Sequence, residues 1–347
     1  MRIPYTWLRP LLFQLPTETA HNLSLTAISR LHRWGLLRFW LRQTQLPQKP
    51  IKLAGITFPN AVGLAAGLDK NGEHIAALAA LGFGFIEVGT VTPKPQPGNP
   101  KPRLFRLKTH NSLINRMGFN NQGIDYLIEQ LERTDYSGVL GINIGKNAAT
   151  PIEKAVEDYV ICLRKAYRHA SYITINISSP NTENLRDLQS GELLSELLST
   201  LKQEQAHLAK QHDRWVPLFV KVAPDLDHQQ IAMVANTICE QGIEGLIATN
   251  TLVKRDHLSH VPGIDETGGI SGHLIKATSR KVIAEFRQAL GPDFPIIGVG
   301  GIHSAADARQ HLQAGANLVQ LYTGLIYEGP DLIRQIQVNL SKTPVSQ

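Results

Sequence analysis

Residues 175–181 place uncharged polar side chains directly after a run of β-branched residues. The run has the composition of a buried strand, and Pro180 ends it because proline removes a ladder donor. The amides of Asn176 and Asn181 can donate and accept hydrogen bonds, as can hydroxyls such as that of Ser179. Such a lining suits a small polar substrate. Taken alone, the stretch favours a serine-rich strand end that caps the next helix, and the case for a substrate site depends on residues elsewhere in the chain.

Two lysines occur in or just after apolar runs. Lys221 lies among valine and phenylalanine, and Lys70 follows the apolar run 61–64. An unpaired ammonium is costly in such surroundings, so each lysine should face a ligand or an acid, such as Asp69 or Asp225. Two lysines with few acids nearby suit a ligand that is, or becomes, negative.

Glycines after two late apolar runs indicate a phosphate site. The segment 298–301 reads Gly-Val-Gly-Gly, and 322–324 reads Tyr-Thr-Gly. Bare backbone amides and a short helix N-terminus at these places can bind a phosphate group. Each segment alone could be a simple turn, but together they favour a phosphate-bearing ligand.

Apolar runs of strand length alternate with helix-length segments from Lys52 onward, as in a parallel α/β fold. Eight runs predict a closed (β/α)8 TIM barrel, with its chemistry at the C-terminal ends of the strands. The predicted strands are 61–64, 85–89, 140–144, 173–177, 218–222, 246–249, 296–299 and 318–321.

Two long connections interrupt this alternation. Residues 90–138 include five prolines near their start, which favours an ordered excursion over the barrel mouth, often a functional lid. Residues 254–272 include four glycines and form a second, mobile candidate.

Composition bounds the class of protein. The chain has 347 residues, 42% of them hydrophobic, so it can bury a large core. It has two cysteines, Cys162 and Cys239, so we expect neither a disulfide framework nor a metal site. We find neither a bilayer-spanning apolar run nor a signal peptide, so we expect a protein that is neither secreted nor membrane-spanning.

The net charge of +6 lies in the first fifty residues, which carry seven basic residues against Glu18. Helices are predicted over 4–15 and from Thr17 to a stop at Gly35, followed by a third apolar piece, 36–41. This N-terminal amphipathic extension (1–45) precedes the barrel (46–347), with 43–50 as the linker. Its arginines and three tryptophans favour a segment at a membrane surface. A helical cap with a solvated basic face is the alternative, and nucleic acid is disfavoured because a recognition motif is absent.

Eight stretches together resemble, in order, the motifs of dihydroorotate dehydrogenases. The resemblance covers nearly the whole chain and is to class 2, the membrane-associated enzymes that use a quinone. The stretches are 63–70 (Gly-Leu-Ala-Ala-Gly-Leu-Asp-Lys), 115–120 (Asn-Arg-Met-Gly-Phe-Asn), 141–146, 176–181, 220–224, 248–251, 268–272 and 297–302.

The resemblance implies a flavin enzyme that oxidises (S)-dihydroorotate to orotate, the fourth step of pyrimidine (UMP) biosynthesis, with FMN in the barrel mouth. Ser179 would remove the C5 proton while hydride leaves C6 for the flavin. A serine hydroxyl is a weak base unaided, so a proton path through Thr182, Phe119 and a water is implied. Lys70 would touch substrate and flavin, and Lys221 would stabilise negative charge at the flavin's pyrimidine edge.

The resemblance also implies the remaining contacts. Substrate would be bound by Lys70, Asn115, Arg116, Met117, Gly118, Phe119, Asn176, Asn181, Asn250 and Thr251. FMN would be bound by Ala66, Gly67, Leu68, Asp69, Lys70, Thr90, Asn143, Asn176, Lys221, Thr249, Gly272, Gly301, Tyr322 and Thr323.

The resemblance to class 2 implies which molecule accepts the electrons. The N-terminal extension would form a slot through which a ubiquinone-type quinone reaches the flavin, with His21 and Arg106 as polar contacts. The resemblance implies a monomer bound peripherally to an anionic bacterial inner membrane on its cytoplasmic side, without nucleic acid. Two alternatives stay open from the residues: an FMN barrel that reduces a pyrimidine ring, and a non-catalytic sensor of a phosphate ligand.

Overall fold

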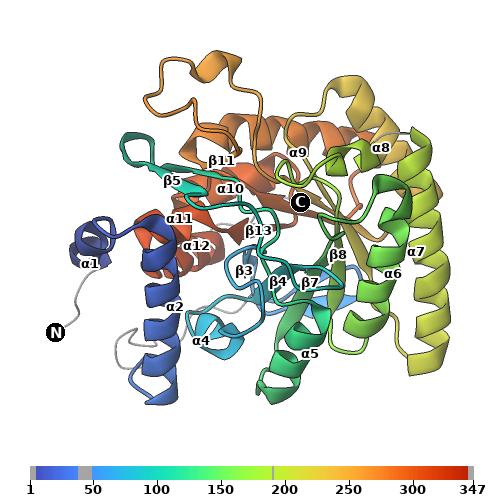
Figure 1. The fold of residues 1–347 in the computed structure, drawn as a ribbon, viewed down its shortest axis with the longest axis horizontal. Coiled ribbons are helices and arrows are strands. Elements are labelled where there is room, and N and C mark those ends of the chain that lie inside the picture. The colour runs from blue at the N-terminus through green and yellow to red at the C-terminus, as the bar shows by residue number, and fades with distance from the viewer. Residues whose placement is uncertain (1–4, 38–48, 190, 343–347) are drawn as a thin grey trace.

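Eight parallel strands close into a barrel, as the sequence predicted (Figure 1). The computed structural model describes residues 5–37, 49–189 and 191–342. Around the barrel the strands follow the order β10-β12-β13-β3-β4-β7-β8-β9. Their bounds are β3 Val62–Leu64, β4 Phe85–Val91, β7 Val139–Ile144, β8 Tyr172–Asn176, β9 Leu218–Val222, β10 Gly245–Ala248, β12 Ile296–Val299 and β13 Leu318–Leu321.

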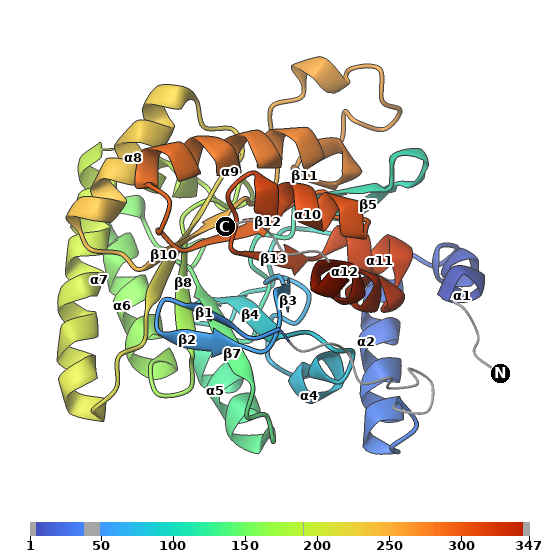
Figure 2. The ribbon, with the colours of Figure 1, turned by 180° about the vertical axis from the view of Figure 1, so that it is seen from behind.

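Helices between successive strands cover the outside of the barrel, which makes the fold a TIM barrel (Figures 1 and 2). Two more helices, α11 and α12, follow the last strand. The bounds are α4 Ile75–Ala79, α5 Ile124–Arg133, α6 Ala155–Ala166, α7 Gly191–His212, α8 His228–Glu240, α9 Lys276–Leu290, α10 Ala305–Gln313, α11 Thr323–Glu328 and α12 Asp331–Lys342.

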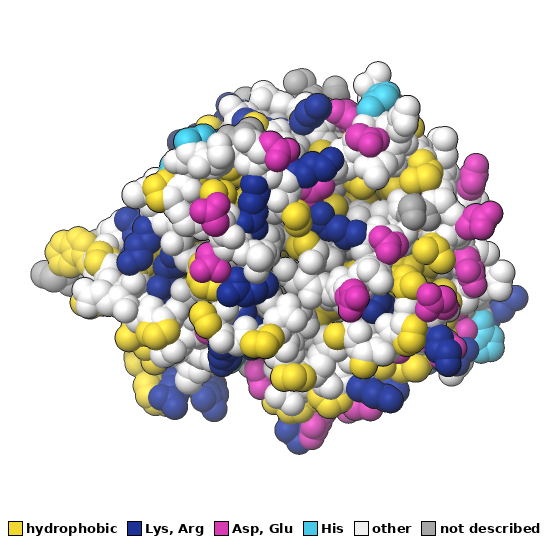
Figure 3. Space-filling view, turned by 45° about the horizontal axis from the view of Figure 1, so that its top comes forward, with side chains coloured by type: hydrophobic (Ala, Val, Ile, Leu, Met, Phe, Trp, Pro, Cys, Tyr) yellow, Lys and Arg dark blue, Asp and Glu magenta, His cyan; other side chains and the backbone are white. Residues whose placement is uncertain are grey.

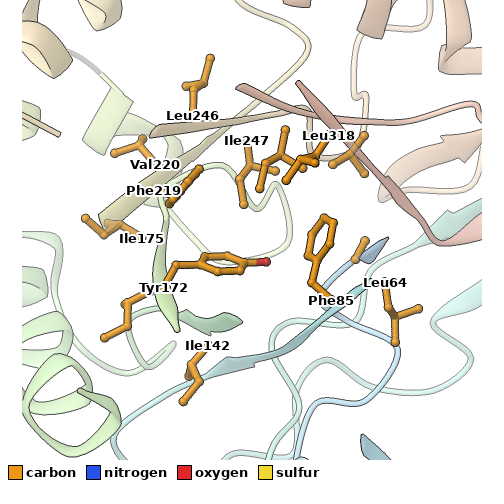
Figure 4. Close-up of a cluster of buried hydrophobic side chains, with 14 of the residues drawn as sticks. Leu64, Phe85, Ile142, Tyr172, Ile175, Phe219, Val220, Leu246, Ile247 and Leu318 are labelled. Carbon is orange, nitrogen blue, oxygen red and sulfur yellow. The ribbon is translucent and has the colours of Figure 1, made fainter. Parts of the chain in front are cut away.

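Aromatic side chains fill the N-terminal half of the barrel. Figure 4 shows Phe85 and Tyr172 projecting into its centre, where their ring centroids are 6.4 Å apart. Glycines on neighbouring strands make room: a Cβ on Gly63 would lie 2.2 Å from Phe85 Cζ, and one on Gly141 would lie 2.2 Å from Tyr172 Cζ. Pairing a large with a small residue in this way fills the interior without strain.

A hairpin that the sequence did not predict closes this end of the barrel (Figure 2). It consists of β1 Ile51–Leu53 and β2 Ile56–Phe58. Phe58 is fully buried, with its ring 5.0 Å from that of Phe85, the first residue of β4. The hairpin therefore covers the N-terminal ends of the strands, away from the end expected to carry the chemistry.

The two long connections meet as a small antiparallel sheet in the order β11-β6-β5. Its strands are β5 Leu104–Leu107 and β6 Ser112–Asn115 from the first connection, and β11 Gly269–Gly272 from the second. The first connection is therefore ordered, as predicted. The second, expected to be mobile, ends in a strand that is paired with β6 from Ser112↔Gly272 to Asn115↔Gly269.

The N-terminal extension begins with α1 Tyr5–Leu12 and α2 Thr17–Arg33. The second helix starts at the predicted residue and ends just before Gly35, which has a φ of 70°. It packs on α4 and β5, while α1 lies by α11 at the edge of the molecule (Figure 1). Of the predicted third piece, 36–41, and the linker, 43–50, the structure describes only residues 36, 37, 49 and 50.

Candidate active site

A cavity opens at the C-terminal ends of the barrel strands. It has about 980 Å³ of space between its walls, open solvent at its mouth included. The structure brings together here most of the residues that the resemblance assigned to substrate and cofactor. Those that line the cavity are Ala66, Gly67, Lys70, Thr90, Asn115, Met117, Gly118, Phe119, Asn176, Ser179, Asn181, Lys221, Thr249, Asn250, Thr251, Gly272, Gly301, Tyr322 and Thr323.

Ser179 lies three residues beyond β8 and is 5% exposed. Its Oγ accepts a hydrogen bond from the Asn181 N–H at 3.3 Å. Thr182 Oγ1 is buried nearby in the sequence and has no hydrogen-bond partner among the described residues. Phe119, the other residue expected on the proton path, lies in the cavity wall.

Asparagine amides connect several strand ends across the cavity. Asn181 Nδ2 donates to Asn115 Oδ1 at 3.2 Å, and Asn250 Nδ2 donates to Asn176 Oδ1 at 3.3 Å. Asn176 Nδ2 in turn donates to Thr90 Oγ1 at 2.8 Å. These amides are held by one another and provide uncharged donors and acceptors for a ligand.

Glycines let the small sheet approach the barrel closely enough to form the outer wall. Gly268 has a φ of 126°, and a Cβ on it would lie 2.3 Å from Asn115 O. A Cβ on the next residue, Gly269, would lie 1.9 Å from Thr251 Oγ1. Side chains at either position would push Asn115 and Thr251 away from the cavity.

The two lysines supply the positive charge of the cavity. Lys70 Nζ donates to Gly67 O at 2.8 Å. Burial and the charge of Arg103 lower the pKa of Lys70 to about 8, against the opposing carboxylates of Glu18 and Asp69. Below that pH the ammonium is available to an anionic group.

Lys221 lies 3.9 Å from a carboxylate that the sequence analysis did not consider, that of Glu87. Burial lowers the pKa of Lys221, and Glu87 opposes this shift. The acids expected beside the lysines have other partners. Asp225 pairs with Arg186 at 2.7 Å, and Asp69 accepts the backbone N–H groups of residues 73 and 74.

Glu87 is fully buried on β4, beneath the cavity. Its carboxylate accepts hydrogen bonds from Asn143 Nδ2 at 2.8 Å, Tyr172 OH at 3.0 Å and Gln320 Nε2 at 2.7 Å. The sequence could have indicated this site, because a glutamate in the middle of an apolar strand is a buried charge that needs partners. The partners themselves come from three other strands.

Four of the predicted residues lie outside the cavity lining. Arg116 pairs with Glu266 at 2.8 Å, and Asp69 caps the turn before α4. Asn143 is buried and holds Glu87, and Leu68 lines a second cavity. Val299 and Gly300, from the glycine-rich segment predicted to bind phosphate, also line the cavity, whereas Ser271, Ile275, Ile302 and Gln320 line it without having been assigned a contact.

The second cavity lies between the N-terminal helices and the barrel, with about 810 Å³ of space between its walls. His21 and Arg106 both line it, and Tyr322 lines both cavities. Burial, with Lys70 and His74, lowers the pKa of His21 to about 3, so its imidazole is neutral near pH 7. Arg106 Nη1 donates to Leu15 O at 2.8 Å, whereas its buried Nε has no partner among the described residues.

No helix in the described part of the chain combines the length and apolarity needed to cross a bilayer.

Comparisons with known proteins agree with the geometry. The family model for dihydroorotate dehydrogenase matches residues 50–343. The chain is 57% identical over 329 residues to dihydroorotate dehydrogenase (quinone) of Chromobacterium violaceum, covering 95% of each chain. It is 54% identical over 338 residues to the enzyme of that name from Thiobacillus denitrificans, covering 97% of this chain and 99% of that one. A crystal structure of the Eimeria tenella enzyme in complex with ferulenol superposes with a TM-score of 0.82 at 36% identity, covering 93% of this chain and 90% of that one. The chain belongs to the dihydroorotate dehydrogenase family.

Proposed function

We propose that this protein oxidises (S)-dihydroorotate to orotate in pyrimidine biosynthesis, with FMN as hydride acceptor and a membrane quinone as final electron acceptor. The observation that carries the proposal is the buried hydroxyl of Ser179 in a cavity whose charged lining residues, within the described chain, are both lysines. A small anionic ring with carbonyl and N–H groups matches such a lining. The names of the relatives support the same substrate and acceptor.

The cavity has features that fit FMN. Gly301 lines the cavity with a φ of 71°, and a Cβ on it would lie 2.5 Å from Lys276 Cα, so only glycine fits there; its backbone N–H would be one that holds a phosphate. Thr323, at the start of α11, adds a hydroxyl to this part of the lining. Elsewhere in the lining, Lys221 offers a cation, and Gln320 Oε1 is an acceptor without a partner among the described residues. Bound FMN would accept the hydride that leaves the substrate.

Ser179 would remove the substrate proton. Its environment holds no charge-assisted partner in the described residues, so the hydroxyl needs somewhere to pass its proton. The buried Thr182 Oγ1, which has no partner among the described residues, supports a path that starts with this hydroxyl. Closing this path with an apolar side chain would leave Ser179 in place yet unable to act as base.

The asparagines would hold the ring and offset the charge that develops at its carbonyl. Donors fixed before the reaction stabilise such charge at little reorganisation cost. Asn181 and Asn115 already hold each other, as do Asn250 and Asn176. Lys70 would bind the substrate carboxylate, and its lowered pKa makes this contact dependent on pH.

We further propose that the second cavity admits the quinone. It is mostly apolar, and its two predicted contacts suit a quinone carbonyl: His21 as a neutral imidazole, and Arg106 with an unused Nε–H. Tyr322 forms part of both cavities, so electrons leaving the flavin would cross a wall about one side chain thick.

The N-terminal helices (domain 1–45) would carry the protein to its lipid-soluble acceptor, with the barrel (46–347) as a catalytic monomer. Exposed apolar side chains on α1 include Trp7, at 73%, and Leu11, at 62%. Leu23 on α2 is 51% exposed, and Trp34, directly after the end of α2, is 69% exposed. Figure 3 shows hydrophobic and basic side chains along this edge of the molecule. Such a surface supports peripheral, salt-sensitive binding to the cytoplasmic face of a bacterial inner membrane.

Replacement of the proposed base tests the function. In the flavin-loaded Ser179→Ala variant, orotate should still bind, while anaerobic bleaching of the flavin by dihydroorotate should slow by at least about 100-fold. Ser179→Cys serves as the chemical control, since a more acidic thiol should recover part of the rate. Unchanged bleaching in Ser179→Ala would reject Ser179 as the base. Failure of the wild type to bleach would reject the substrate.

A further inference from the structure

An ion pair connects the first turn of α2 to the long connection over the barrel mouth. Glu18 accepts hydrogen bonds from Arg103 Nη2 at 2.7 Å and from its Nε at 3.3 Å. The other terminal nitrogen, Nη1, donates to Pro97 O at 2.6 Å and Asn99 O at 2.9 Å. Arg103 is 6% exposed, and a buried guanidinium needs acceptors for all its N–H groups. Glu18 therefore supplies the acceptors for Nε and Nη2, and the carbonyl groups of the turn at 97–99 supply those for Nη1.

This turn packs directly on the wall of the catalytic cavity. The Asn99 N–H donates to Met117 O at 3.0 Å, and Asn99 Nδ2 donates to Asn181 O at 3.3 Å. Contact is close enough that a Cβ on Gly118 would lie 2.9 Å from Asn99 Cγ. Met117, Gly118 and Asn181 all line the cavity. Because the packing is tight, the turn cannot shift without moving the wall or opening a gap behind it.

We propose that Glu18 and Arg103 are positioning residues for substrate, so that α2 holds one wall of the catalytic cavity as well as one wall of the second cavity. This inference rests on the proposed function, because it takes the wall at 115–119 and Asn181 as the substrate side. Helix α2 performs both tasks with neighbouring residues of its first turns. His21 lines the second cavity, while Glu18, three residues earlier, reaches Arg103.

The same pair also acts on Lys70 through space. The charge of Arg103 lowers the pKa of Lys70, and the charges of Glu18 and Asp69 raise it. The other titratable group near Lys70 on α2, His21, is neutral near pH 7. Loss of Glu18 should therefore move the pKa of Lys70 down, whereas loss of Arg103 should move it up. A role in packing alone would not produce shifts of opposite sign.

The test measures orotate binding to the flavin-loaded full chain by calorimetry across a pH series. In Glu18→Gln, the Kd for orotate should rise about tenfold and the KM for dihydroorotate with it, because the wall is displaced. The pH at which orotate affinity begins to fall should be lower in Glu18→Gln than in the wild type. In Arg103→Met that pH should be higher. Changes in kcat at saturating substrate, and in the KM for quinone, should stay within about threefold.

Lys101→Met is the matched control. Lys101 also contacts Glu18, at 3.6 Å, but its side chain is 66% exposed, so its loss should leave the orotate Kd unchanged. Should Glu18→Gln fail to fold, Glu18→Asp and Arg103→Lys, which keep the charges but lengthen the contacts, should show the same loss of affinity in milder form. Wild-type orotate affinity in folded Glu18 variants would overturn the inference, as would a change confined to the quinone KM. A wild type that does not bind orotate would instead overturn the proposed function.

Discussion

Replacement of Glu87 by glutamine should strongly destabilise the barrel, although the two side chains have nearly the same shape. The carboxylate accepts from three donors and lies 3.9 Å from the Lys221 ammonium. A glutamine has one oxygen, which can serve Tyr172 and Gln320, but its NH2 group would then face the NH2 group of Asn143. One buried donor is left unsatisfied, and one buried cation loses its counter-charge.

The unsatisfied donor and the unpaired cation together determine how much stability the Glu87→Gln variant loses. An unsatisfied buried donor costs about 1–3 kcal/mol, and breaking a buried ion pair costs about 3–5 kcal/mol. The second figure is an upper limit here, because Lys221 can release its proton; burial already lowers its pKa, and Glu87 is the group that opposes this. We therefore expect a loss of about 3–5 kcal/mol in the free energy of unfolding.

Urea unfolding followed by circular dichroism measures this loss, with Thr174→Val as the matched control. Thr174 is also fully buried in the barrel, but its Oγ1 has no partner among the described residues, so valine should cost less than about 1 kcal/mol. In the double variant Glu87→Gln/Lys221→Met the unpaired cation is gone, so the combined loss should fall short of the sum by more than about 1 kcal/mol. A loss below about 1 kcal/mol in Glu87→Gln, or strict additivity, would refute this account of the network.

Two further predictions concern charge and surface. Orotate affinity should fall by up to about tenfold per pH unit above about pH 8, because Lys70 loses its proton there, and Lys70→Met should remove this inflection in calorimetric titrations; a retained inflection would assign it to another group. Replacing Trp7 and Leu11 together by serine should weaken binding to anionic vesicles in flotation assays by at least about tenfold. Trp215→Ser, at an exposed position on the barrel (52%), should leave vesicle binding unchanged, and equal losses in both variants would argue against a specific membrane face.

The barrel could be predicted because its signal is local. Each predicted strand overlaps an observed one, and three have the observed bounds. A short run of β-branched residues is enough to indicate a buried strand without knowledge of its partners. The hairpin β1–β2 was missed because its strands are three residues long and, unlike the equally short β3, only partly buried. The β6–β11 pair was missed because it joins Ser112 to Gly272, and no local pattern specifies a partner so far along the chain.

The cavity was predictable for a different reason. Barrel topology gathers the strand ends, so residues as far apart as Thr90 and Thr323 meet without any pairwise signal. Prediction from the local sequence was wrong where a side chain turns away from the cavity, as Arg116 does to pair with Glu266. It also failed for Glu87, because its partners Tyr172 and Gln320 lie on β8 and β13, which are not neighbours of β4 and reach Glu87 only inside the closed barrel.

The two cavities share more than a wall. Tyr322 belongs to both linings, and α2 contributes His21 to one and, through Glu18 and Arg103, holds the turn behind the other. A barrel that received electrons and passed them to a distant partner would need no such sharing. On the proposed function, a movement of α2 that admits the quinone would also shift the turn at 97–99, because Glu18 on α2 pairs with Arg103. Substrate affinity and access of the acceptor should therefore change together when α2 moves.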